Sequence, residues 1–281
     1  MKTKILFALA AGMFMMQSCN NDDHPLAQTD NVEAVLAAKY PSAKNVEWKT
    51  QGSYKVADFK YENTSTVAWF DQYAQWQMTE TDIPYRSLPA AVKKAFESSE
   101  YATWRIEDVD KIERLNMETV YVIEVEKANK EVDLYYSPTG VLVKTVVDTD
   151  NDQDDSDDYI HYIPQQPTTG INKIIAQKYP KAKIVEVDHE NGRIEVEIVD
   201  GNVRRDVYFD HSEKWLYTQT DVRVSSLPQL VVKAISTSYP GYRIDDAEYW
   251  ETPAGNYFLL EIERGKSEMK VRVSPTGQII R

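Results

Sequence analysis

The sequence predicts an α+β fold with two tandem domains, each an antiparallel sheet that carries helices on one face. Residues 70–95 recur as residues 209–234 at a constant offset of 139, and twelve of these positions are identical. An echo of this length at a fixed offset indicates a duplicated domain. In both copies, segments with helical spacing are followed by segments that alternate apolar and polar side chains. This order predicts helices packed against antiparallel strands.

The first copy is expected over residues 31–148 and the second over residues 170–281. Outside the central repeat, the KYP motif that starts at Lys39 returns at Lys178, and the SPTG motif that starts at Ser137 returns at Ser274. The offset falls from 139 to 137 along the copies, so single residues have been lost twice. Loops tolerate such losses better than helices or strands do.

Each copy should contain two units in which a helix precedes strands. Residues 32–40 place apolar side chains on one helical face, and Pro41 ends that helix. Ser87 is the expected N-cap of the next helix, in which Val92 and Phe96 share a face. The third and fourth helices follow from the repeat.

Runs with a period of two follow each helix, and this period is typical of strands with one buried face. In the second copy, Ile194, Val196 and Ile198 alternate with polar neighbours. Asn-Gly at residue 191 and Asp-Gly at residue 200 separate such runs, as expected for hairpin turns.

The order of these motifs resembles the PepSY-like family, also called beta-lactamase-inhibitor-like proteins, which are common among Bacteroidetes lipoproteins. The shared features are Phe-Asp, a following Trp, Thr-x-Thr, Leu-Pro-x-x-Val-x-Lys-Ala and the final Ser-Pro-Thr-Gly, and both copies have them. The resemblance implies about eight antiparallel strands in each domain, with helices on one side, and a binding role outside the cytoplasm. It implies no shared activity, because a fold does not carry a function.

Residues 1–19 read as a lipoprotein signal peptide. Two lysines precede an apolar run too short to span a bilayer, and the segment ends Met-Gln-Ser-Cys, which resembles a bacterial lipobox. Cys19 is the only cysteine in the chain and the expected site of lipidation; the alternative is a secretory signal with an unrelated cysteine. Residues 20–30 would form a tether, whose acidic start resembles a surface-export signal. The expected location is the outer membrane of the cell envelope, facing outward.

A formal net charge of −13 argues against nucleic acid as a partner and against an electrostatic hold on anionic lipid. Contact with the membrane is therefore expected through the lipid anchor only. No histidine spacing fits a metal site, and no glycine pattern fits a phosphate loop. The sequence predicts no cofactor and no enzymatic activity.

Residues 149–169 form an acidic linker in this interpretation. Asp148, Asp150, Asp152 and Asp154 have the spacing of a calcium loop, but Gln153 and Tyr159 occupy the positions that require glycine and glutamate. A charged, self-repelling linker is the favoured reading.

The leading functional hypothesis is a module that binds a protein or peptide through the sheet faces opposite the helices. In one version of this hypothesis the module inhibits the protein that it binds. A glycan- or calcium-binding accessory protein of the cell surface is the alternative. Exposed tyrosine beside charge is typical of binding surfaces. The side chains expected on these faces are Glu124, Glu126, Asp133, Tyr135, Glu195, Glu197, Arg204, Asp206, Tyr208, Lys270 and Arg272.

Overall fold

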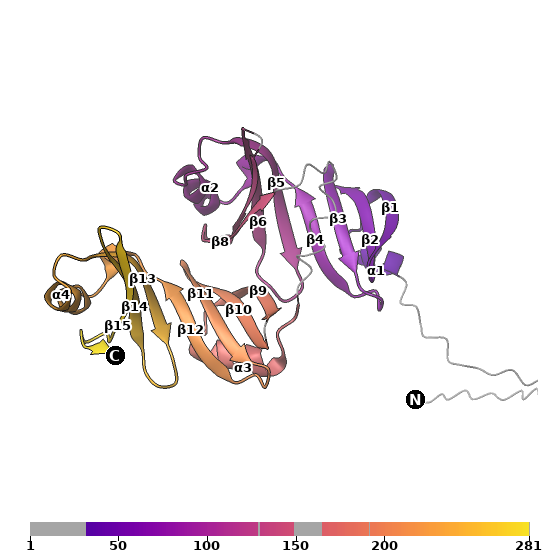
Figure 1. Ribbon diagram of the computed structural model, residues 1–281. Helices are drawn as coiled ribbons and strands as arrows, with labels where there is room; N and C mark the ends of the chain where they lie inside the picture. The colour runs from indigo at the N-terminus through magenta and orange to yellow at the C-terminus, as the bar shows by residue number, and fades with distance from the viewer. Residues whose placement is uncertain (1–31, 129, 149–164, 191, 281) are drawn as a thin grey trace, which may run out of the picture.

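The computed structural model describes residues 32–128, 130–148, 165–190 and 192–280. They form two eight-stranded antiparallel sheets, and the strands follow one another along each sheet in chain order (Figure 1). The predicted class, tandem α+β domains, is confirmed. The predicted signal peptide, Cys19, the predicted tether and the predicted linker up to residue 164 lie outside the described residues. None of the described helices is long and apolar enough to cross a membrane.

The first copy begins with a helix and has a second helix between its fourth and fifth strands. Its elements are α1 (Val32–Lys39), β1 (Lys44–Gln51), β2 (Tyr54–Tyr61), β3 (Thr64–Phe70), β4 (Trp76–Asp82), a 3-10 turn (Tyr85–Ser87), α2 (Ala90–Glu97), β5 (Arg105–Arg114), β6 (Val120–Lys127), β7 (Lys130–Tyr136) and β8 (Leu142–Asp148).

The second copy repeats this order. Its elements are α3 (Thr169–Lys178), β9 (Lys183–Glu190), β10 (Arg193–Asp200), β11 (Val203–Asp210), β12 (Trp215–Asp221), a 3-10 turn (Val224–Ser226), α4 (Gln229–Ser238), β13 (Arg243–Glu251), β14 (Tyr257–Arg264), β15 (Ser267–Val273) and β16 (Ile279–Ile280). Ser87 is not the N-cap of α2, because it lies in the 3-10 turn and Pro89 directly precedes the helix.

Each helix buries its apolar stripe on one side of its sheet, which gives every copy two small cores. In the first copy, Leu36 packs with Phe59 and Phe70, and Phe96 of α2 packs with Leu134. Full burial of such side chains stabilises the fold by about 1.5–3 kcal/mol each. The side of each sheet opposite its helices is called the open face below, because none of the described helices of the same copy covers it.

The most strongly repeated residues serve these cores. Oδ1 of Asp71 accepts hydrogen bonds from two backbone N–H groups of the β3–β4 loop, at 2.9 and 2.8 Å, and Asp210 does the same in the second copy. The indole of Trp76 donates to the hydroxyl of Thr79 at 2.7 Å, and the hydroxyl of Tyr40 lies 2.5 Å from the same atom. The repeated motif therefore fixes a loop and a helix end.

The two copies are joined by more than the chain between them. β9 carries a β-bulge at which Val185 is the extra residue, and Val185 and Val199 belong to the same buried cluster as Trp69 and Met78 on the open face of the first sheet. Figure 1 shows β9 as the part of the second sheet nearest the first. The burial of Val185, which is 2% exposed, therefore depends on both copies.

Polar contacts fix this arrangement at three points. The backbone N–H of Glu118 donates to the carbonyl of Ile184 at 2.8 Å, and the hydroxyl of Thr139 donates to the carbonyl of Gly201 at 3.1 Å. Nζ of Lys144 lies 3.0 Å from Oε1 of Glu186. The hydrophobic face of the first sheet is therefore completed by residues of the second copy, Val185 and Val199.

Candidate functional site

The open faces of the two copies have different chemistry although their backbones correspond. In the first copy Val56, Trp69, Met78 and Ile112 are fully buried within the cluster that Val185 joins. The corresponding residues of the second copy are Glu195, Tyr208, Tyr217 and Trp250. The valine has become acidic, the methionine and the isoleucine have become aromatic, and the tryptophan is replaced by another aromatic residue. These four side chains of the second copy are half-buried.

These aromatic side chains of the second copy form a continuous ladder across four strands. Ring centroids of Tyr208 and Tyr217 are 4.5 Å apart with an interplanar angle of 29°. Tyr217 and Trp250 follow at 4.7 Å and 27°, and Trp250 and Tyr257 at 5.9 Å and 12°. The guanidinium of Arg272 lies 5.2 Å from the ring centroid of Tyr257, so a cation closes this end. We call these five residues the aromatic ladder.

The near-parallel stacking determines what the ladder offers to a ligand. Each inner ring has a neighbouring ring stacked on either side, so its two faces are occupied and its edges remain for a ligand. Tyr208 donates its hydroxyl to Oε1 of Glu195 at 2.9 Å, and the indole of Trp250 donates to Oε2 of Glu248 at 2.7 Å. Stacked rings held by hydrogen bonds lose little further freedom on binding, and such rigid aromatic area is typical of protein interfaces.

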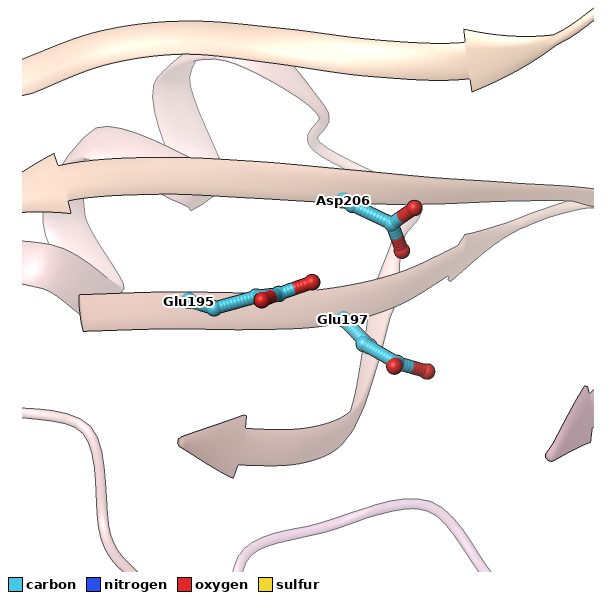
Figure 2. Close-up of side chains that lie close together, drawn as sticks. All are labelled: Glu195, Glu197 and Asp206. Carbon is cyan, nitrogen blue, oxygen red and sulfur yellow. The ribbon is translucent and has the colours of Figure 1, made fainter. Parts of the chain in front are cut away.

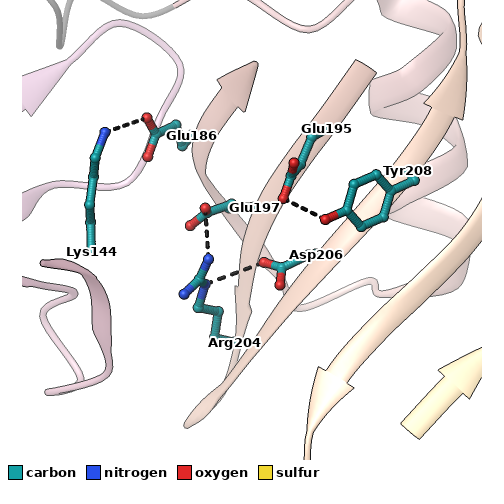
Figure 3. A network of polar contacts seen from close by, with 7 residues as sticks. All are labelled: Lys144, Glu186, Glu195, Glu197, Arg204, Asp206 and Tyr208. Carbon is teal, nitrogen blue, oxygen red and sulfur yellow. Dashed lines mark hydrogen bonds and ion pairs between the residues drawn. The ribbon is translucent and has the colours of Figure 1, made fainter. Parts of the chain in front are cut away.

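A network of carboxylates surrounds Arg204 beside the ladder (Figure 3). Nη2 of Arg204 donates to Oε1 of Glu197 at 2.8 Å, and its Nε lies 3.3 Å from Oδ1 of Asp206, as an ion pair without hydrogen-bond geometry. Figure 2 shows Glu195 and Glu197 on one strand and Asp206 on the next, with their carboxylates side by side. One oxygen from each of the three carboxylates lies within 4.8 Å of the others.

Burial raises the pKa of Glu197 to about 8, although the Arg204 guanidinium acts in the opposite direction. Burial also raises the pKa of Glu195 and that of Asp206 above their usual values. Three close carboxylates would suit a divalent cation, but the Arg204 guanidinium already supplies positive charge to two of them. The arrangement is an arginine-centred network that holds β10 and β11 together, and it does not fit a metal centre.

The sequence-predicted face residues fall into two groups. Glu124, Glu126 and Asp133 are half-buried on β6 and β7, where Glu124 and Glu126 line an acidic depression with Glu107, Asp108 and Glu131. Tyr135 was expected on a binding surface, but it is 2% exposed and belongs to the cluster that Val185 joins.

The remaining predicted residues lie on the second sheet. The structure brings Glu195, Glu197, Arg204, Asp206 and Tyr208 together, as described above. Lys270 lies further along the sheet and pairs with Glu261 at 3.6 Å, while Arg272 is exposed at the end of the ladder. Asp148 is the last residue of β8, whereas Asp150, Asp152 and Asp154 lie outside the described residues.

Sequence reasoning missed Tyr217, Trp250 and Tyr257. A position-by-position comparison of the copies would have found all three, because they replace Met78, Ile112 and Val120, which are buried together on the same face of the first sheet. Trp76, by contrast, packs in the core beneath α1, as its repetition in the sequence suggested.

Similar solved structures include three proteins from different Bacteroides species. A DUF2874 family protein from Bacteroides uniformis is 32% identical, with 44% of this chain and 91% of that chain covered and a TM-score of 0.42. A BLIP-like protein from Bacteroides fragilis is 37% identical, with 43% of this chain and 87% of that chain covered and a TM-score of 0.42. A protein from Bacteroides eggerthii, described as "putative periplasmic", is 29% identical, with 42% of this chain and 87% of that chain covered and a TM-score of 0.41. No curated protein matches the chain.

The family model described as "Putative beta-lactamase-inhibitor-like, PepSY-like" matches residues 52–144, 160–203 and 193–281. These segments include strands of both sheets and extend over more than half of the chain. The chain therefore belongs to the PepSY-like, beta-lactamase-inhibitor-like family, and it carries two copies of the family's domain.

Proposed function

We propose that this protein is a non-enzymatic, lipid-anchored binding module of the cell envelope that engages a protein or peptide through the open face of its second sheet. The aromatic ladder is the observation that carries the proposal. It places four stacked rings, ended by Glu195 and Arg272, on the face whose counterpart in the first copy is buried against protein.

The ladder favours protein over glycan as the ligand. Sugar rings bind aromatic side chains by lying on an exposed ring face, and here the inner faces are stacked on one another at 4.5–5.9 Å. Ring edges, hydroxyls and flanking charges remain, and protein interfaces combine such aromatic anchors with a polar rim. A glycan- or calcium-binding accessory protein is for this reason the weaker alternative.

Proximity capture of partners on intact cells tests the proposal, with the parent chain compared to Tyr217→Ala and Trp250→Ala. Both variants should lose at least about tenfold in captured partner, the effect of removing one strong aromatic anchor. Leu230→Ala changes an exposed apolar residue on α4, away from the ladder, and should capture as the parent does. Undiminished capture by both ladder variants would show that another surface binds.

The lipid anchor rests on Cys19 and the segment before it. Cys19→Ala should move the protein from the membrane pellet to the soluble fraction after cell breakage, since two or three acyl chains hold a protein stably on a bilayer. Protein that still pelleted with membranes after this change would rule out the anchor.

A further inference from the structure

The contact between the two copies has two different halves. One half is the open face of the first sheet, which includes Trp69 and Met78. The other half is the β9 edge of the second sheet, where the bulge turns Val185 into that face and Glu186 pairs with Lys144. Each copy possesses both halves because the domain is duplicated, but within one chain only one half of each copy is used.

The unused half of the first copy is the β1 edge. β1 has a register shift where β9 has its bulge, and Val46 and Glu47 correspond there to Val185 and Glu186. Val46 is 37% exposed, whereas Val185 is 2% exposed. Of these two equivalent valines, Val185 is thus buried by the contact between the copies, and Val46 is open to solvent.

The unused half of the second copy is the open face that bears the aromatic ladder. Its charge matches the β1 edge. Val199, which packs on the first sheet, corresponds to exposed Lys60 on β2. Lys60 lies directly opposite Lys44 of β1 in the strand register. On the face, the apolar Val56 and Val67 correspond to Glu195 and Asp206. One apolar residue of the contact within the chain, Val199, thus corresponds to a cation on the unused edge, and two apolar residues of the face correspond to carboxylates. Lys44 adds a second cation at this edge and corresponds to Lys183.

We propose that the open face of the second copy is occupied by the β1 edge of a second copy of this chain, with Val46, Lys44 and Lys60 lying against the aromatic ladder and Glu195. This inference rests on the proposed function, since it names the partner of the same surface. Because the two halves differ, the contact is heterologous and leaves one free face and one free edge, so chains would associate head to tail.

Sedimentation velocity of the full chain carrying Cys19→Ala tests this inference. The parent should show a sedimentation coefficient that rises with protein concentration. Val46→Asp, which places a carboxylate on the edge, and Trp250→Ala, which opens the ladder, should each sediment as one chain at all concentrations. Val232→Asp alters an exposed valine of α4 and should associate as the parent does. Arg272→Glu is a second face variant, at an exposed site, in case Trp250→Ala fails to fold.

A mixture of the two variants that should not associate alone, Val46→Asp and Trp250→Ala, gives the decisive result. Val46→Asp retains a working face and Trp250→Ala retains a working edge, so the mixture should form a species of two chains and nothing larger. A parent that remains a single chain at every concentration, or a mixture that does not associate, would overturn the inference. If Trp250→Ala nevertheless still lost partner capture on cells, the proposed function would stand with a different protein as partner.

Discussion

At the scale of single residues, the positions that the copies share and the positions in which they differ have different roles. Asp71 and Trp76 recur because they fix a loop and a helix end. Met78 and Tyr217 differ because one faces the other copy and the other belongs to the ladder. Identity between the copies therefore marks the fold, and divergence on the open faces marks the surface that we propose for binding.

The ionisation of Glu80 makes the stability of the first copy depend on pH. It is a largely buried carboxylate on β4, and burial, reinforced by the charge of Asp110, raises its pKa to about 9. Its Oε2 has no hydrogen-bond partner among the described residues. Because the folded-state pKa exceeds the unfolded one, the folded chain holds this proton more tightly, and stability falls as pH rises from about 4.5 to about 9.

Glu80→Gln should therefore raise the free energy of unfolding by about 1 kcal/mol at pH 8 and leave it nearly unchanged at pH 4. Urea titrations of both proteins at the two pH values measure this. Glu62→Gln removes one carboxylate from an exposed turn and controls for the change in net charge. An equal effect of Glu80→Gln at both pH values would contradict the assigned ionisation.

At the scale of elements, the SPTG hairpins show how far the sequence determines the structure. The motif predicted a turn, and the structure shows in addition that Gly140 sits against the start of α2 with φ of +79°. The helices, the alternating strands and the duplication followed from local patterns. The bulge at Val185 and the ladder did not, because a bulge depends on the register of two strands and stacking depends on neighbours far apart in the chain.

Gly140→Ala should destabilise the protein by about 3 kcal/mol, because the added Cβ would lie near the Ala91 carbonyl and the backbone would remain left-handed. Its Cβ would be 2.4 Å from that oxygen. Gly265→Ala has a similar φ of +66° with no atom within 4 Å, and should cost only about 1 kcal/mol. Thermal or urea unfolding compares the two, and equal losses would mean that the contact with α2 does not matter.

At the scale of the whole molecule, duplication has produced two sheets with unequal roles. The open face of the first sheet is joined to the second copy through Val185 and Val199, and the pair Lys144–Glu186 fixes the contact. The equivalent face of the second sheet carries the ladder. The sequence alone predicted two equal platforms, since it could not show that one copy lies on the other. The central claim is that one face is covered and the other available.

Cysteine labelling in the folded protein measures that claim directly. In a Cys19→Ala background, a cysteine is placed at Val122, which is 1% exposed, or at the corresponding Leu259, which is half-buried on the ladder face. With a maleimide reagent and dilute protein, Val122→Cys should react at least about tenfold more slowly than Leu259→Cys, because it requires local opening of the contact between the copies. In denaturant both should react alike. Equal rates in the folded protein would contradict the covered and available faces described here.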